Sequence, residues 1–293
     1  MPPPTWIVPD HIPYGGVVVV YGPPGEGKTF MTMDLALSIA SGKQWQGRPT
    51  EAGLVVYIAA EGGFGVPQRI RAWCSTHLAA PTSLRIAWLL ETAAIDGREE
   101  DAMSALIGRI HELVDTPVLI VIDTLARCLV GDENTQQDMG AFVAGVDLLR
   151  EEFGSTVIVV HHTNVGGIRE RGSTSLRGAA DTLIKVSRDK DGTITALCDK
   201  QKDAEQFATL EMRLQVVPEH ASAVMVPAQL ASANVILKWL DIGPLSFKEM
   251  KARLSEPGGT PMAVSTLKRR LRELKENGKI IKENDVYEKS GTP

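Results

Sequence analysis

Residues 22–29 spell GPPGEGKT, which is the most informative motif in the chain. It follows the apolar run 17–21 (VVVVY) and precedes a helix-like segment, which is the strand, loop and helix context of a phosphate-binding P-loop. Glycines let backbone N–H groups wrap the phosphates, Lys28 reaches the β- and γ-phosphates, and the Thr29 hydroxyl can ligate Mg²⁺ at the positive end of the helix. The alternative is an ordinary Gly/Pro turn before an amphipathic helix.

The motif predicts which residues surround a bound nucleotide, with ATP and Mg²⁺ as the expected ligands. The predicted nucleotide contacts are Gly22, Pro23, Pro24, Gly25, Glu26, Gly27, Lys28, Thr29 and Phe30.

Length and composition favour a globular protein of 293 residues, which is enough for one well-cored domain and a small second one. Cys74, Cys128 and Cys198 show no CxxC spacing, which favours a reducing compartment over a disulfide framework or a zinc site. No long apolar stretch or secretory signal is visible. We therefore expect a cytoplasmic protein with no membrane partner.

Charge is distributed unevenly along the chain. From Ala231 onward there are 8 Lys and 4 Arg against 2 Asp and 6 Glu, a net charge of +4, whereas the whole chain carries −5 and the remainder therefore −9. A basic C-terminal domain beside an acidic core is one interpretation, and a solvated face with surplus lysines is the other.

Eight short runs rich in β-branched residues alternate with helical patterns over the first 217 residues. Helix-length segments separate the first five, which predicts an α/β fold with a mostly parallel sheet and helices on both faces. The last three are closely spaced and predict an antiparallel extension at one edge. The predicted strands are 17–21, 54–60, 85–90, 118–122, 156–160, 182–186, 193–198 and 208–217.

The sequence predicts three segments: an ATPase domain over 1–217, a linker over 218–230 and a second domain over 231–293. The linker prediction rests on two prolines and the lack of a clear period. Apolar spacing in the second domain predicts helices around 235–240, 247–254 and 264–274. Asn277 and Gly278 then precede a predicted hairpin of strands 279–282 and 286–289. Three helices followed by a hairpin form the winged-helix pattern.

Two carboxylates follow predicted strands, at the edge where parallel sheets bind ligands. Asp123 ends the run VLIVID, the Walker B arrangement that holds Mg²⁺, although an apolar strand ending in Asp is common by itself. Glu61 precedes Gly62 and Gly63 and is the candidate that orients and deprotonates the attacking water. A carboxylate that merely interacts with a helix dipole is the alternative for Glu61.

Two histidines, His161 and His162, end the predicted strand 156–160. An imidazole at this edge could contact the γ-phosphate and respond to its loss. A zinc pair is less attractive, because adjacent strand residues point to opposite sides and no cysteine lies nearby to complete a site. A purely structural histidine stays open.

The segments GPPGEGKT, YIAAEGG, VLIVIDT, VIVVHHT and RGSTSLRGAADTLIKVSRD occur in the order and spacing of RecA-like hexameric NTPases. Over residues 6–217 the chain resembles the RepA-type replicative helicases of plasmids and phages. The resemblance implies a homo-oligomeric, hexameric ring with nucleotide between subunits. It also implies that Glu61 is the catalytic glutamate and that His161 or His162 senses the γ-phosphate.

The resemblance further implies basic residues that act on the neighbouring subunit's nucleotide. Lys200 and Lys202 lie where related ring helicases carry a Lys-x-Arg pair, and Arg188 resembles the arginine finger of related phage helicases. Cations alternating on one strand project to the same face, so both lysines could approach one phosphate cluster. Lysine in place of arginine weakens the argument for a bidentate contact. Solvated surface cations are the alternative.

Predicted DNA contacts lie in two regions. Residues 163–175 form a polar, glycine-bearing segment at the position of a central-pore loop in the resembled family, although a surface loop is the alternative. A basic face of the third C-terminal helix suits a DNA groove, although winged helices also dock proteins. The predicted contacts are Arg169, Arg171, Ser173 and Thr174 in the loop, and Lys268, Arg269 and Arg272 in the helix.

These observations favour an ATP-driven DNA helicase or translocase that acts on single-stranded DNA, with a replication-initiation protein as a further candidate partner. A DNA-binding regulatory or recombination ATPase without unwinding activity is the second interpretation. A small-molecule kinase is the third, and it is disfavoured because no lid or acceptor pocket is evident.

Overall fold

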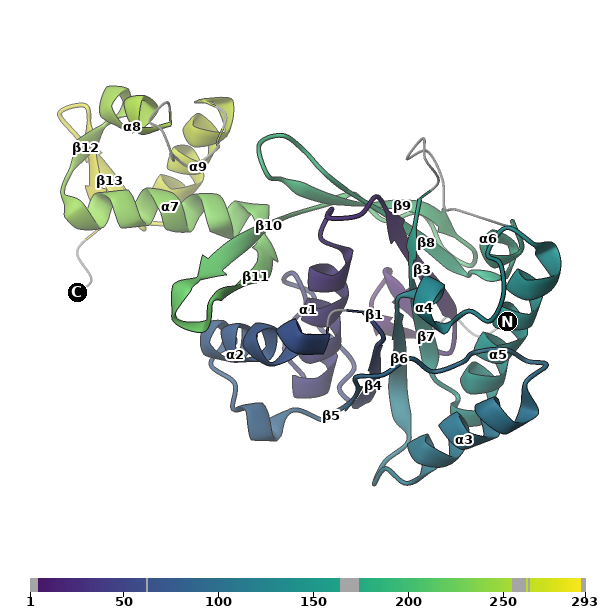
Figure 1. Ribbon diagram of the computed structural model, residues 1–293. Coiled ribbons are helices and arrows are strands. Elements are labelled where there is room, and N and C mark those ends of the chain that lie inside the picture. The colour runs from purple at the N-terminus through teal and green to yellow at the C-terminus, as the bar shows by residue number, and fades with distance from the viewer. Residues whose placement is uncertain (1–4, 62, 164–173, 255–261, 263, 291–293) are drawn as a thin grey trace. The chain divides into compact units, whose positions relative to one another are not determined.

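The computed structural model describes residues 5–61, 63–163, 174–254, 262 and 264–290 (Figure 1). The chain forms two compact units. Unit 1 comprises Met1–Arg188, Ile194–Leu210 and Val216–Met225, and unit 2 comprises Asp189–Thr193, Glu211–Gln215 and Val226–Pro293.

A nine-stranded sheet has the order β11-β10-β9-β8-β3-β7-β6-β4-β5. Its strands are β3 (Val17–Gly22), β4 (Leu54–Ala59), β5 (Ile86–Leu89), β6 (Pro117–Asp123), β7 (Thr156–His162), β8 (Thr182–Arg188), β9 (Ile194–Gln201), β10 (Leu210–Val217) and β11 (Ser222–Pro227). A separate antiparallel pair consists of β1 (Trp6–Val8) and β2 (Ile12–Pro13).

The helices of unit 1 connect these strands. They are α1 (Lys28–Ser41), α2 (Val66–His77), α3 (Glu100–His111), α4 (Leu125–Cys128), α5 (Gln136–Phe153) and α6 (Ser175–Ala179). Short 3₁₀ turns lie at η1 (Gly63–Gly65), η2 (Pro81–Ser83) and η3 (Pro218–His220).

Pairing from β8 through β5 is parallel throughout. The prediction of a mostly parallel α/β sheet is therefore confirmed, but the antiparallel extension begins one strand later than predicted. β8 pairs in parallel with β3, and β9 is the strand that runs antiparallel to β8. The reason is that residues 163–181 are long enough for the crossover that a parallel strand needs.

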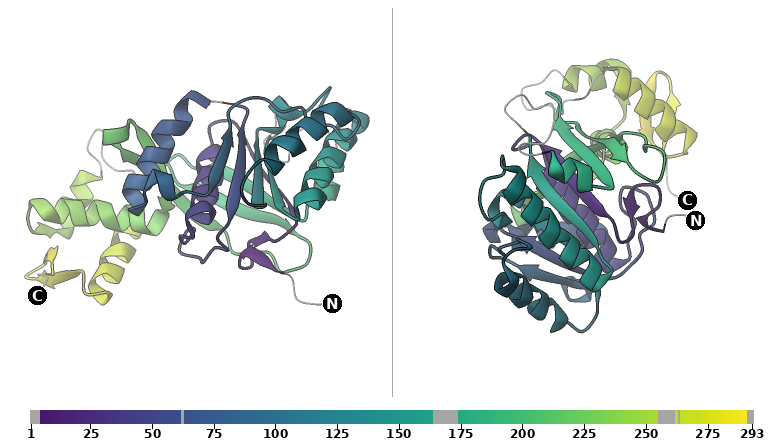
Figure 2. Two further views of the ribbon diagram at one scale, coloured as in Figure 1. Left: turned by 90° about the horizontal axis from the view of Figure 1, so that it is seen from below. Right: turned by 90° about the vertical axis from the view of Figure 1, so that its right-hand side faces the viewer.

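The central parallel strands β3, β6 and β7 are apolar on both faces, because helices cover both sides of this part of the sheet. In β3, Val17, Val19 and Tyr21 join one cluster with buried residues of α3 and α5, while Val18 and Val20 alternate to the opposite side. Helix α1 contacts β3, β4 and β6. Figure 1 and Figure 2 show α1 and α2 on one side of the strands and α3 and α5 on the other.

Among the described residues from Val226 onward, unit 2 contains three helices and a small antiparallel sheet of order β12-β14-β13. Its elements are α7 (Ala228–Ile242), β12 (Leu245–Ser246), α8 (Phe247–Arg253), α9 (Val264–Glu276), β13 (Ile280–Glu283) and β14 (Val286–Lys289). Apolar residues of the helices and β13 form its core, among them Ile236, Met250, Leu271 and Ile280. The two-residue strand β12 is too short to leave a sequence pattern and was not predicted.

Residues 218–230 are not the linker that their prolines suggested. They contain η3, strand β11 and the start of α7. In β11 the consecutive residues Val224, Met225 and Val226 are buried, and this strand pairs beside β10 at the sheet edge. Pro218 and Pro227 stand at the ends of these elements, where a missing N–H donor does not interrupt pairing.

Within the part of the chain that the structure describes, no helix combines the length and the apolar character needed to cross a membrane.

Helix α1 of unit 1 carries a buried carboxyl group. Asp34 is 3% exposed, and its two oxygens accept hydrogen bonds from Trp73 Nε1 and Gln46 Nε2, each at 2.8 Å. Burial raises the pKa of Asp34 from 3.8 to about 7, although these hydrogen bonds act to lower it. The folded protein therefore holds a proton that the unfolded chain releases near pH 4.

This difference predicts that stability falls as pH rises from about 4 to about 7, by about 1.4 kcal/mol per pH unit from this group. Asp34→Asn should remove that fall, because asparagine carries no charge and the Gln46 amide can rotate to pair with it. Urea unfolding at pH 5 and pH 8 measures the effect. The exposed Asp115→Asn serves as control, and an Asp34→Asn protein with the wild-type pH dependence would contradict the assignment.

Candidate nucleotide-binding site

Glycines shape the loop between β3 and α1. A Cβ at Gly22 would lie 2.1 Å from the Val186 carbonyl oxygen of β8, so only glycine allows these strands to meet there. Gly25 and Gly27 have φ values of 81° and 96°, in the left-handed region that favours glycine. The loop delivers the chain to the N-terminus of α1, where backbone N–H groups are available to phosphate oxygens.

Lys28 is 5% exposed and lies inside this loop. Its Nζ donates hydrogen bonds to the carbonyl oxygens of Gly22 and Pro23, both at 2.8 Å, and lies 3.4 Å from His162 Nδ1. Burial lowers the pKa of Lys28, although nearby carboxylates act to raise it. The ammonium group is therefore held where the phosphates of a P-loop ligand bind.

Thr29 and Asp123 meet across the carboxyl ends of β3 and β6. Thr29 Oγ1 donates to Asp123 Oδ1 at 3.4 Å, and Asp123 is 2% exposed. A hydroxyl and a carboxylate are oxygen ligands of the kind that Mg²⁺ uses beside nucleotide phosphates, so this pair fits the predicted metal site.

Tyr57 is a site residue that the sequence analysis missed. From β4, its hydroxyl donates to Asp123 Oδ2 at 2.7 Å and lies 3.1 Å from Thr32 Oγ1 of α1. Burial raises the pKa of Asp123, and the hydrogen bonds from Tyr57 and Thr29 act against this rise. The available signal was a tyrosine in the otherwise aliphatic strand LVVYIA.

Glu61 lies just beyond β4 at the same edge of the sheet. It is exposed, and its Oε2 accepts a hydrogen bond from Thr124 Oγ1 at 3.2 Å. Its charge acts on both Lys28 and Asp123. The structure therefore gathers the predicted base, the P-loop lysine and the Walker B carboxylate at one edge.

The two histidines point to different surroundings. His162 is partly exposed beside Lys28, whereas His161 is fully buried. This is the alternation of a strand, because β7 continues through both residues in register with Tyr21 and Gly22. Of the two, only His162 lies where a phosphate bound in the P-loop can reach it.

Two further residues that the sequence predicts at the P-loop, Phe30 and Glu26, each contact an arginine residue. Phe30 packs under Arg69 of α2, whose guanidinium carbon lies 4.6 Å from the ring centroid. The Glu26 carboxylate accepts a hydrogen bond from the backbone N–H of Arg188, the last residue of β8. The candidate finger Arg188 is exposed and its backbone lies beside its own P-loop.

A family model described as AAA domain matches residues 1–167, more than half of the chain. The chain belongs to this family. Among solved structures, the crystal structure of the RadB recombinase is similar, with a TM-score of 0.49 and 15% identity over 72% of this chain and 90% of that chain. The family and the P-loop geometry make the protein a P-loop ATPase.

Lys200 and Lys202 of this ATPase have different partners within the subunit. Lys200 Nζ donates to the carbonyl oxygens of Arg177, Gly178 and Ala180 at the end of α6. The predicted alternation does not extend to Lys202, because β9 ends at Gln201.

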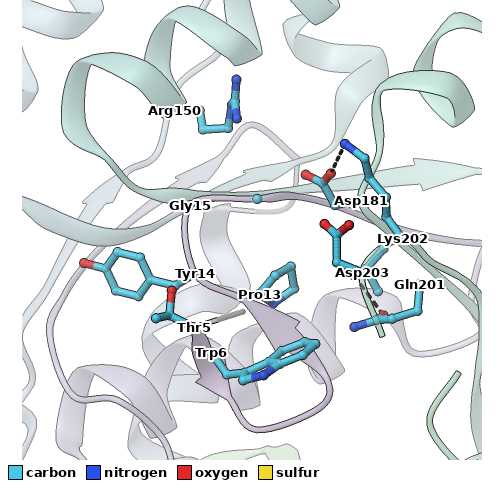
Figure 3. Close-up of a pocket in the computed structure, with 12 residues that line it drawn as sticks. Thr5, Trp6, Pro13, Tyr14, Gly15, Arg150, Asp181, Gln201, Lys202 and Asp203 are labelled. Atoms are coloured by element: carbon cyan, nitrogen blue, oxygen red, sulfur yellow. Dashed lines mark hydrogen bonds and ion pairs between the residues drawn. The ribbon is translucent and has the colours of Figure 1, made fainter. Parts of the chain in front are cut away.

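Lys202 lines a pocket of about 410 Å³ that Figure 3 shows in close-up. Its Nζ lies 3.2 Å from Asp181 Oδ1, and the other oxygen of Asp181 accepts the backbone N–H of Val17 at 2.9 Å. Val17 begins β3, so this pocket lies at the opposite end of that strand from the P-loop.

The predicted DNA contacts are only partly described. Arg169, Arg171 and Ser173 lie outside the described residues, and Thr174 immediately precedes α6. In unit 2 the predicted contacts are exposed on α9; they are Lys268, Arg269 and Arg272.

The substitution Tyr57→Phe tests whether the Tyr57 hydroxyl positions Asp123. The ring still packs, but the loss of the hydroxyl removes a donor from Asp123, so the ATPase should need about tenfold more Mg²⁺ for half-maximal rate. Mg²⁺ titrations at saturating ATP measure this effect, with the exposed Tyr14→Phe as control. An unchanged Mg²⁺ requirement would show that Tyr57 does not position Asp123.

Proposed function

We propose that this ATPase is a DNA helicase or translocase of the RepA-like type, which works as a homo-oligomeric, hexameric ring and hydrolyses ATP between neighbouring subunits. The observation that carries the proposal is the position of Lys202. Its side chain is 61% exposed, at the far end of β3 from the P-loop. Six strand residues span about 20 Å, so Lys202 is too far from its own P-loop but is available to a neighbour's nucleotide.

The residues at the P-loop suit hydrolysis by in-line attack of water. Glu61 is the proposed base, because Asp123 is committed to the metal. Lys28 stabilises negative charge on the phosphates, and Lys202 of the adjacent subunit adds a second cation. Thr29 and Asp123 would hold Mg²⁺, which would supply positive charge beside the nucleotide phosphates.

The link to DNA begins at His162, the proposed γ-phosphate sensor. Its position beside Lys28 supports this role. Residues 164–173 follow it, and they lie outside the described part of the chain. We assign their arginines, Arg169 and Arg171, to the phosphates of single-stranded DNA. We also assign unit 2 as a winged-helix module that contacts DNA.

Two assays test the proposed function together. A helicase or translocase should hydrolyse ATP faster when single-stranded DNA is added, and it should displace a strand from a forked duplex. Stimulation without displacement would instead indicate a DNA-binding regulatory or recombination ATPase. Hydrolysis that DNA does not change would reject a DNA-driven motor.

Separate substitutions distinguish binding from hydrolysis. Lys28→Ala should lose both ATP binding and turnover, because it removes the cation inside the P-loop. Glu61→Gln should keep ATP binding and lose turnover by about 10² or more, as expected for a general base. Titration with a fluorescent ATP analogue and steady-state ATPase rates measure the two effects. The control is Glu112→Gln, which changes an exposed glutamate at the end of α3. A wild-type turnover rate in Glu61→Gln would show that Glu61 is not the catalytic base.

A mixing experiment tests the shared site. Lys28→Ala and Lys202→Ala subunits should each be nearly inactive alone, but a mixture regenerates some sites with an intact Lys28 from one subunit and an intact Lys202 from the next. ATPase activity of the mixture should then exceed either protein alone. Mixing Lys28→Ala with Lys279→Ala, which changes an exposed lysine of unit 2, gives the dilution control. Strictly additive rates in well-mixed oligomers would count against a site shared between subunits.

A further inference from the structure

Unit 2 contains a groove of about 310 Å³ between α8, α9 and the β13–β14 hairpin. Four of its described lining residues are cations, Lys268, Arg272, Lys275 and Lys282. Two are aromatic, Phe247 and Tyr287, and Leu271 completes the set. None of these lining residues is acidic.

Helix α9 builds one wall of the groove because it is amphipathic. Leu267, Leu271 and Leu274 are buried in the core of unit 2. Lys268, Arg272 and Lys275 recur at helical spacing and are all exposed. They form a continuous basic stripe along one side of the helix. Arg269 is exposed on the same helix but does not line the groove.

The opposite wall adds a fourth cation. Lys282 of β13 pairs with Asp285 at 2.7 Å, and the Asp285 side chain is 92% exposed. Ion pairs this exposed contribute little because water and salt screen them. Lys282 can therefore exchange this partner for a phosphate at small cost.

Both aromatic rings lie next to the cations. Lys268 Nζ is 5.6 Å from the Phe247 ring centroid, and Lys282 Nζ is 5.5 Å from the Tyr287 ring centroid. Phe247 and Tyr287 are each partly exposed while also packing against the core of unit 2. Each ring is thus fixed in place and presents part of its surface to the groove.

Cations that track a phosphate backbone, interleaved with aromatic rings, are the pattern of single-strand binding sites. A duplex buries the faces of its bases in the stack and leaves such rings without a partner. An acidic peptide would pair with the cations but has no regular flat groups for the rings. The groove therefore matches an unstacked nucleic-acid strand better than either alternative.

We infer that this groove holds a segment of single-stranded DNA, with phosphates on the four cations and bases against Phe247 and Tyr287. The choice of DNA over RNA rests on the proposed function. The groove needs neither ATP nor the P-loop, so it should bind the strand equally well in the full-length Lys28→Ala protein.

Charge substitutions test the phosphate contacts. In the full-length Lys28→Ala protein, Arg272→Ala/Lys275→Ala should weaken binding of a fluorescent oligo-dT at least tenfold at low salt. It should also reduce the slope of log K against log salt by about 1.4, at about 0.7 for each phosphate contact. Lys238→Ala is the control, since it removes an exposed cation of unit 2 that does not line the groove. An effect of Lys238→Ala as large as that of a single groove substitution would overturn the assignment.

Ring substitutions test the base contacts and map the strand. Tyr287→Leu should weaken oligo-dT binding about tenfold, whereas Tyr287→Phe, which keeps the ring, should bind like the parent. Photo-crosslinking of an oligonucleotide containing 5-iodouracil should modify Tyr287 or Phe247, as read by peptide mass spectrometry. Equal losses in Tyr287→Leu and Tyr287→Phe, or cross-links confined to unit 1, would overturn the inference.

Competition identifies the ligand class. Unlabelled oligo-dT should displace the probe at much lower concentration than duplex DNA, oligo-U RNA or polyglutamate. Better competition by duplex, RNA or polyglutamate would overturn the inference in favour of that class. DNA-stimulated ATPase is scored separately in proteins with an intact P-loop. If DNA binds the groove but does not stimulate the ATPase, only the proposed motor function is rejected. If DNA stimulates the ATPase but does not cross-link to the groove, only the groove assignment is rejected.

Discussion

The burial of the Lys28 ammonium group is the constraint on which the rest of unit 1 depends. Removing a charge from water costs several kcal/mol unless polar partners replace the lost hydration. The P-loop supplies two carbonyl oxygens, and Asp123, Glu26 and Glu61 contribute negative charge around it. These groups come from the ends of separate elements, so the lysine is satisfied only if β3, β4 and β6 end together. Parallel pairing of the strands meets that requirement.

Much of unit 1 could be predicted because its strands are buried on both faces. Continuous β-branched runs mark such strands, and the predicted strand limits lie close to the observed ones. The P-loop and Asp123 could be brought together for the same reason, since the carboxyl ends of neighbouring parallel strands share one edge. The order of strands could not be deduced, because it depends on crossovers through segments such as 163–181.

What the sequence could not reveal depends on contacts between distant residues. The Tyr57 hydroxyl donates to Asp123, which lies 66 positions away in the sequence. The residues around Tyr57 do not indicate this contact. The resemblance implies that Lys200 contacts a neighbour's phosphate, whereas within its own subunit its Nζ donates to carbonyl oxygens at the end of α6, a contact that no sequence pattern indicates. The sequence did not predict strand β11, because Pro218 and Pro227 suggested a loop. In the structure these prolines lie on either side of a short apolar run.

The nucleotide end of β3 is also tied to α6, the helix that follows residues 164–173. The Tyr21 hydroxyl, next to the P-loop, donates to Asp199 Oδ2 at 2.7 Å, and Arg177 of α6 donates to the same oxygen at 2.8 Å. Burial acts to raise the pKa of Asp199, yet these hydrogen bonds hold it below its usual range. Loss of either donor would leave the Asp199 carboxylate, whose side chain is 31% exposed, with one fewer protein hydrogen bond. Since Lys200 also holds the carbonyl end of α6, β3, β9 and α6 share one polar network and resist separate displacement.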